Sequence, residues 1–145
     1  MPEYFDFLMD HLDLEPVYQI HKRMLQILQW KCPRPRWALK YPNHVIAMPQ
    51  IRKVHPRGRF VMTHRDPVQV VASIAKMTYS LRNVRQVGGC DPHRAGAQMV
   101  HFIRRHIDRI MDFCTGPDAG CVHHVDYYRL AADPPPCSTR SMPAS

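Results

Sequence analysis

Apolar side chains recur at helical spacing along the first part of the chain, from residue 2 to residue 30. The pattern breaks at Glu15-Pro16, where a proline favours the first turn of a new helix. Its members are Phe5, Leu8, Met9, Leu12, Val17, Ile20, Met24, Ile27 and Leu28. Intervals of three and four residues predict two amphipathic helices that follow one another.

Short apolar runs followed by helical patterns occur twice in the next part of the chain. Residues 37–39 lead into a helix that ends near Val54, and residues 59–63 lead into a helix that ends near Ser80. A third apolar run covers residues 121–125. Because strand and helix alternate, we expect these three strands to lie side by side and parallel in an α/β sheet.

The strongest amphipathic pattern covers residues 92–114, between the second and third predicted strands. Residues 81–91 contain a Gly-Gly pair and little periodicity, which predicts a loop before this helix. Residues 135–145 are rich in proline and serine and predict a disordered tail. The pattern therefore indicates one domain over residues 1–134, helical up to residue 36 and α/β from residue 37.

Composition narrows the class of protein without naming it. A chain of 145 residues with 45% hydrophobic residues can bury one core, so we expect one domain or a large piece of one. The formal net charge of +8 is scattered rather than gathered in a tail, which suits a surface or cleft that meets anions.

The termini and the cysteines bear on the compartment. The first residues lack a basic region and no apolar run reaches about 18 residues, so we expect neither a signal peptide nor a membrane span. Five cysteines lie far apart without a Cys-x-x-Cys pair, which indicates neither a disulfide framework nor a zinc knuckle. A reducing cytoplasm is the expected setting.

The most informative chemistry lies at residues 60–73, where a predicted strand turns into a helix. Asp66 is a good N-cap and Pro67 a good first helical residue, so Arg65 sits in the turn beside a helix N-terminus. Ser73 falls on the exposed flank that faces the turn. Arg65 and Ser73 can therefore converge on one phosphate, although an ordinary capped helix with a solvated arginine gives the same pattern.

Segment 60–73 resembles the 3′-phosphate-binding motif of the sulfotransferase superfamily. In that motif an arginine that ends a strand and a serine eight positions later hold the 3′-phosphate of the donor nucleotide, and Arg65 and Ser73 have that spacing. Residues 37–44 resemble the Leu-Lys-Ser-Pro-x-His stretch of bacterial members, and residues 127–134 resemble their Tyr-x-x-Leu-x-x-x-Pro strand end. The three motifs occur in the order of the family and together span most of the chain.

The resemblance implies a sulfotransferase that moves a sulfuryl group from 3′-phosphoadenosine 5′-phosphosulfate to a hydroxyl acceptor, without a metal. It also implies a three-layer α/β fold with a parallel central sheet, similar to that of P-loop nucleoside triphosphatases. The nature of the acceptor, whether a lipid, a sugar or a small metabolite, stays open.

The resemblance also assigns roles to individual residues. Arg65 and Ser73 would bind the 3′-phosphate, and Tyr127 would stack on or bond to the adenine, unless it is a core tyrosine at a strand end. Lys40, at the C-terminal end of its predicted strand, would contact the sulfuryl or bridging oxygen. His44 would serve as the base, or else is a surface histidine at a helix cap.

Two departures from the family pattern stand out. The family begins with a strand and a Gly- and Thr-rich loop around the 5′-phosphosulfate, and nothing before Trp37 offers such a loop. Family members also continue into C-terminal helices where this chain has its Pro-rich tail. We therefore expect an incomplete fold, which a gene fragment, a wrongly assigned start or a frameshift would each produce. We expect little activity of the chain on its own and an exposed sheet edge that favours self-association.

Two other readings come from different classes of protein. A small basic nucleic-acid-binding protein is compatible with the charge and with Arg104-Arg105, but the basic residues alternate with Asp108 and Asp112 and form no single stripe. A metal site at His123-His124, or at His101 with His106, lacks the spacing of a zinc motif.

Overall fold

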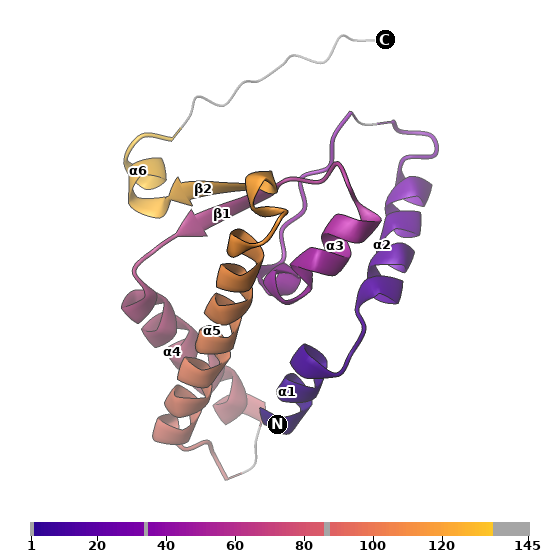
Figure 1. The fold of residues 1–145 in the computed structure, drawn as a ribbon. Helices are drawn as coiled ribbons and strands as arrows, with labels where there is room; N and C mark the ends of the chain where they lie inside the picture. Colours follow the sequence, from indigo (N-terminus) through magenta and orange to yellow (C-terminus); the bar gives the residue numbers. More distant parts are fainter. Residues whose placement is uncertain (1, 34, 86–87, 135–145) are drawn as a thin grey trace.

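The computed structural model describes residues 2–33, 35–85 and 88–134. Two helices open the chain, α1 (Pro2–Asp10) and α2 (Glu15–Leu28), which confirms the predicted helical pair (Figure 1). Pro16 lies in the first turn of α2, where its missing N–H costs no hydrogen bond. None of the helices in these ranges has the length and apolar character that a membrane crossing requires.

A 3₁₀ helix, η1 (Pro42–Ala47), continues directly into the short helix α3 (Met48–Val54). The two pack against α2 around a core of buried Tyr18, Ala47 and Val54. Half-buried Leu14, Ile46 and Ile51 surround this core. The predicted helix ending near Val54 is therefore confirmed, although its first part has the tighter 3₁₀ geometry.

The predicted strand at residues 37–39 is wrong, because no strand forms there in the described chain. The run of three residues is bounded by Pro35 and Pro42, and proline supplies no N–H for a ladder. Trp37 and Leu39 line a cavity beside α2 instead of pairing with a strand. Both side chains stay largely exposed, so within the described chain this segment has neither a strand partner nor a place in the buried core.

Two strands form a parallel sheet, β1 (Phe60–His64) and β2 (Val122–Asp126), as predicted for these two segments. The register sets Phe60 opposite Val122 and His64 opposite Asp126. Within the described ranges the sheet has these two strands, so a central sheet of three strands does not form. The α/β class is confirmed in this reduced form.

Two long helices connect the strands, α4 (Pro67–Arg85) and α5 (Pro92–Thr115), and they pack against each other (Figure 1). Phe113 of α5 meets Phe60 edge to face, with ring centres 5.5 Å apart. Buried Ala95 and Met99 lie on the same helix. The predicted amphipathic helix over 92–114 is confirmed and extends by one residue.

The loop predicted over residues 81–91 begins later than expected, because α4 continues to Arg85. No glycine or proline interrupts residues 81–85, and Arg82 donates a hydrogen bond to Gln98 of α5. The turn itself contains Gly88 and Gly89, whose φ angles of 93° and 80° strain any other residue.

The end of the described chain contains a 3₁₀ turn, η2 (Ala119–Cys121), before β2 and a short helix, α6 (Tyr127–Ala132), directly after it. Asp126 caps α6 by accepting a hydrogen bond from the backbone N–H of Arg129 at 2.8 Å. Residues 135–145, where we predict a disordered tail, lie outside the described residues.

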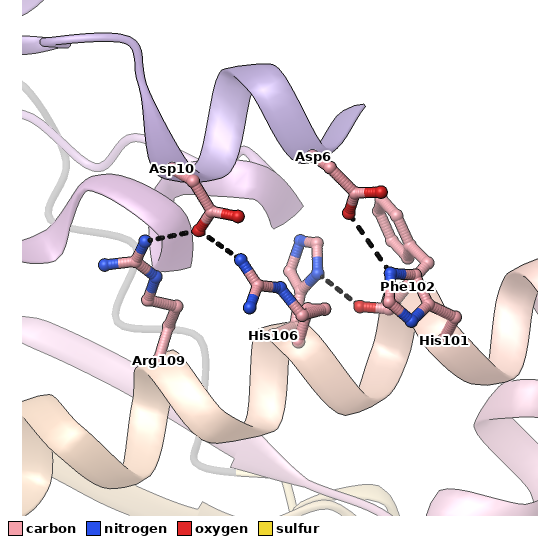
Figure 2. Close-up of polar contacts among 7 residues, drawn as sticks. Asp6, Asp10, His101, Phe102, His106 and Arg109 are labelled. Atoms are coloured by element: carbon pink, nitrogen blue, oxygen red, sulfur yellow. Dashed lines mark hydrogen bonds and ion pairs between the residues drawn. The ribbon is translucent and has the colours of Figure 1, made fainter. Parts of the chain in front are cut away.

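Polar contacts fasten α1 to α5, as Figure 2 shows. The carboxylate of Asp6 lies 3.1 Å from His101 Nε2, and Asp10 pairs with both Arg105 and Arg109. Arg109 also donates to the backbone carbonyl of Met9 at 2.6 Å. These partners are partly exposed, so each pair is worth only about 0.2–1 kcal/mol and orients α1 more than it stabilises it.

The histidines of α5 that the sequence offered as metal ligands have these structural contacts instead. His106 is buried and its Nδ1 donates to the backbone carbonyl of Phe102 at 2.9 Å. Burial lowers the pKa of His106, against the opposing effect of that hydrogen bond. Across the part of the chain that the structure describes, no group of three or more His, Cys, Asp or Glu side chains can hold a metal ion.

Candidate functional site

The C-terminal ends of the two strands bring together two of the predicted nucleotide ligands. Because the strands are parallel and His64 lies opposite Asp126, the next residues, Arg65 and Tyr127, emerge at the same edge of the sheet. The guanidinium carbon of Arg65 lies 5.1 Å from the centre of the Tyr127 ring, a cation–π contact. Arg65 and Tyr127 are therefore neighbours although 62 positions separate them.

Gln69 ties this edge together. Its side-chain oxygen accepts a hydrogen bond from Arg65 Nη2 at 3.2 Å and another from the Tyr128 hydroxyl at 3.1 Å. Gln69 stands four positions after Arg65, in the first turn of α4, a spacing at which a side chain reaches back over the turn that precedes the helix. That spacing could have identified Gln69 as a partner of Arg65, whereas the contact with Tyr128 depends on the pairing of the strands.

The first turn of α4 has the predicted cap. Asp66 accepts a hydrogen bond from the N–H of Val68 at 2.9 Å through its side chain, and Val70 N–H donates to its backbone carbonyl at 3.1 Å. Pro67 is the first helical residue, also as predicted. Arg65 thus precedes a helix N-terminus, whose free N–H groups favour an anion.

Ser73 lies on the same helix as Gln69, four positions further along, and is exposed. One helical turn, about 5.4 Å of rise, therefore separates Ser73 from the glutamine that holds Arg65. A phosphate presents oxygens to donors on several sides, so convergence of the Arg65 guanidinium and the Ser73 hydroxyl on one phosphate stays a prediction. Val70, Val71 and Ile74 form the half-buried stripe of the helix, as the pattern predicts.

A histidine pair lies on the same part of the sheet. His64 Nε2 is 2.7 Å from His124 Nδ1, and the two rings stack with centres 4.9 Å apart. The sequence presented His123-His124 as a possible metal pair or as solvated side chains. In the structure His124 is bonded across the sheet to His64, a contact that only the register reveals.

The two predicted catalytic residues lie elsewhere. Lys40 is exposed in the segment without secondary structure that precedes η1, so the strand end on which its predicted role depended is absent. His44 belongs to η1, and its Nδ1 shares a hydrogen bond of 2.8 Å with the Tyr18 hydroxyl. Burial, and then the proximity of His21, lower the pKa of His44, so the ring is held neutral, as a base requires.

His44 faces a cavity of about 600 Å³ that reaches the first residue of β1. We call it the histidine cavity, and its walls include Tyr18, His21, Trp37, His44, His55 and Phe60. Phe60 and Arg65 are five residues apart along an extended chain, a rise of about 16 Å. The structure therefore places His44 near the opposite end of β1 from Arg65, and no described contact joins the two groups.

A parallel strand pair, with an arginine at the turn from β1 into α4, defines an α/β protein whose strand ends carry a guanidinium beside a helix N-terminus. The chain belongs to the sulfotransferase family, because the model of that family, described as Sulfotransferase family, matches residues 2–140. The match begins before Trp37, so the N-terminal helical pair lies within the family region. No curated protein and no solved structure matches the chain.

Proposed function

We propose that this chain binds the nucleotide of 3′-phosphoadenosine 5′-phosphosulfate at the C-terminal ends of β1 and β2, for sulfuryl transfer to a hydroxyl acceptor. The observation that supports the proposal is the contact of Arg65 with Tyr127, from two family motifs far apart in the sequence. An aromatic ring beside a guanidinium offers a surface for the adenine next to a cation for its phosphate.

Arg65 would bind the 3′-phosphate as a charged donor. A guanidinium has five N–H donors, so Arg65 can keep its bond to Gln69 and still present a fork to the phosphate. Ser73 would add its hydroxyl from the next turn of α4, and the α4 N-terminus would add its dipole. Each bond to a charged group contributes roughly 1.5–3 kcal/mol, enough to make the 3′-phosphate decisive for affinity.

The sulfuryl end of the donor has less support in this sequence. The first glycine is Gly58, so the Gly- and Thr-rich loop that the family wraps around the phosphosulfate has no counterpart before it. Preorganised donors around a transferring group are usually the largest catalytic contribution, and losing one costs about a hundredfold to a thousandfold. We propose that the 145-residue chain binds nucleotide with little or no turnover.

The roles of Lys40 and His44 belong to the same proposal. The neutral ring of His44 suits a general base, and the exposed ammonium of Lys40 suits a contact with the sulfuryl oxygens. Both would need to approach the nucleotide, for example in a complete three-layer fold in which residues 37–39 pair beside β1 in the central sheet. The three-layer, P-loop-like architecture is proposed for that assembled state.

Calorimetric titration tests the nucleotide assignment. The chain should bind adenosine 3′,5′-bisphosphate at least tenfold more tightly than adenosine 5′-monophosphate, because only the first carries the 3′-phosphate. Ser73→Ala should weaken the bisphosphate about fivefold, and Ser73→Thr, which keeps the hydroxyl, should restore most of the affinity. Equal affinities for the two nucleotides would contradict the proposal.

A turnover assay tests the proposal that the chain has little or no sulfotransferase activity. With radiolabelled donor and lipid, sugar and phenolic acceptors, the purified chain should transfer no sulfate above background. Robust transfer would show that residues of this chain do hold the phosphosulfate.

Compartment and association are further parts of the proposal. The structure has free thiols at Cys32, Cys90, Cys114 and Cys121, which supports a reducing cytoplasm.

Each strand of the sheet has one partner in the described chain, and Val61 is 70% exposed, which supports self-association through the open edge of the sheet. Sedimentation should show dimers or larger species at micromolar concentration, and a monomer at these concentrations would contradict self-association.

A further inference from the structure

The histidine cavity lies apart from the residues proposed above to hold the nucleotide, and of that proposal it contains only His44. α2 provides one wall, η1 and the end of α3 provide another, and the segments before Lys40 and before β1 close the rim. Its volume of about 600 Å³ lies within the range of small-molecule sites. Four successive segments between residues 18 and 60 thus enclose one space.

The charged side chains on this cavity are all basic. Lys22, Arg36, Arg57 and Arg59 line it together with His21, His44 and His55, and no Asp or Glu is among the described residues of its walls. Arg36, Arg57 and Arg59 are exposed at the rim. Such a concentration of positive charge around a hollow attracts anions.

The remaining wall is apolar and partly aromatic. It consists of Leu25, Trp37, Leu39, Ile51, Val54 and Phe60. Trp37 is 41% exposed and Leu39 47% exposed, so both present apolar surface to whatever enters. An inorganic anion would leave this surface wet, whereas an anion that carries an apolar ring would cover it.

Arg52 fixes the rim. Its Nε donates to Asp118 at 2.9 Å, and its Nη1 donates to the backbone carbonyls of Pro56 and Gly58. A Cβ at Gly58 would lie 3.0 Å from the His55 carbonyl oxygen, so a larger residue there would displace the turn. The segment that bears Arg57 and Arg59 is therefore held in place before any ligand arrives.

Two ring nitrogens at the cavity lack a hydrogen-bond partner among the residues that the structure describes. His21 Nδ1 and His55 Nε2 are buried, and neither makes a hydrogen bond within the described residues. The rings of His21 and His55 lie 6.1 Å apart, and His21 lies 6.5 Å from His44. Buried polar atoms without a partner are costly, and a bound acceptor atom would satisfy them.

We propose that the histidine cavity binds an organic anion with an apolar ring body, such as an aryl sulfonate, sulfate or carboxylate, and takes up protons on binding. Rim arginines hold the anionic group, Trp37 and Phe60 cover the ring, and the histidines donate once protonated. The site is separate from the nucleotide site, because it opens at the first residue of β1 and Arg65 follows the last.

The proton uptake follows from the groups that face the histidines. Burial lowers the pKa of His44 and His55, and nearby His21 lowers both further. An anion beside these rings favours their charged form and raises the pKa again, so affinity rises as pH falls. The titratable groups that face the histidines come from α2 and from the segments around it. They are Tyr18, His21, Lys22, Arg36, Tyr41, His44, His55, Arg57 and Arg59.

Tryptophan fluorescence reports binding directly. The chain has two tryptophans, and Trp30 is 82% exposed, so Trp30→Phe leaves Trp37 of the cavity as the single reporter. Titration with 2-naphthalenesulfonate should quench Trp37, with affinity at least tenfold higher than that of neutral 2-naphthalenesulfonamide. Affinity should increase between pH 7.5 and pH 6.0.

Matched variants separate the cavity from general binding to apolar surface. Arg57→Gln should weaken the sulfonate about tenfold, Arg57→Lys should weaken it much less, and Arg23→Gln, on α2 but not on the cavity wall, should have no effect. Far-UV circular dichroism checks that each variant is folded. Equal affinity for the two naphthalenes, or equal loss in the Arg57→Gln and Arg23→Gln variants, would overturn the proposal.

Competition makes this inference independent of the proposed function. Adenosine 3′,5′-bisphosphate should neither quench Trp37 nor displace the sulfonate, and Arg65→Ala should leave sulfonate binding unchanged. Displacement by the bisphosphate would overturn the separation of the two sites, whereas failure of nucleotide binding alone would leave the cavity proposal intact.

Discussion

The two ends of β1 are built in different ways. At its C-terminal end, Arg65 is exposed and held by one hydrogen bond and one aromatic contact. At its N-terminal end, Phe60 borders a half-enclosed cavity with three histidines and a packed wall of buried core residues. The C-terminal end is a local motif, whereas the N-terminal end is a product of tertiary packing. Substitutions should therefore affect mainly ligand affinity at the C-terminal end and mainly stability at the N-terminal end.

The largest effect on stability should follow Val54→Ala. Val54 is 8% exposed, lines the histidine cavity and packs with Tyr18 and Ala47. Removing its two methyl groups should lower the free energy of unfolding by about 2 kcal/mol in urea titrations. Val84→Ala, at a site 88% exposed, is the matched control and should change stability little. Equal effects would mean that the cavity wall is no packed core.

Lowering the pH should reduce the stability that the histidines of the cavity contribute to the fold. The contacts of Arg65 at the other end of β1 involve none of these histidines. Burial lowers the pKa of His44 and His55, whereas histidine in the unfolded chain has a pKa of about 6.5. Their contribution to stability is therefore fully present above that pKa and is lost as pH falls towards the folded values.

Urea unfolding at pH 7.5 and pH 5.5 measures this dependence. Stability should be lower at pH 5.5, and the double substitution His44→Gln with His55→Gln should flatten the dependence, while His93→Gln at an exposed site should not. A pH dependence that is the same in all three proteins would contradict the assignment.

A smaller effect is expected at the strand edge from Gln69→Ala. Losing the shared acceptor frees the side chains of Arg65 and Tyr128, so adenosine 3′,5′-bisphosphate should bind about threefold more weakly with nearly unchanged stability. Gln19→Ala, on exposed α2, is the control for a lost surface amide. If Gln69→Ala lowered the free energy of unfolding by more than it lowered the free energy of nucleotide binding, the contrast between the two ends of β1 would be contradicted.

The part of the fold that depends on local pattern was predictable from the sequence. Amphipathic spacing predicted α1, α2 and α5, and the Asp66-Pro67 cap predicted the start of α4. The resemblance at residues 60–73 also predicted the family that the family comparison shows. In these cases the responsible residues lie within one or two helical turns of each other.

What depended on distant partners was not predictable. The run at residues 37–39 is apolar enough for a strand, yet Trp37 and Leu39 line a cavity together with residues of α2. The pairing of His64 with His124 depends on the register of two strands. Lys40 and His44 are near Arg65 only if residues 37–39 pair beside β1, so their catalytic roles stay predictions.

The most direct test of the central claim is the coupling between Arg65 and the 3′-phosphate. The free energy that the 3′-phosphate adds to binding is the difference between adenosine 3′,5′-bisphosphate and adenosine 5′-monophosphate, measured by calorimetry in the unsubstituted chain, in Arg65→Ala and in the control Arg23→Ala. We predict that Arg65→Ala removes roughly 1.5–3 kcal/mol of this difference and that Arg23→Ala removes none. An unchanged difference in Arg65→Ala would contradict the claim that the edge formed by β1 and β2 holds the 3′-phosphate.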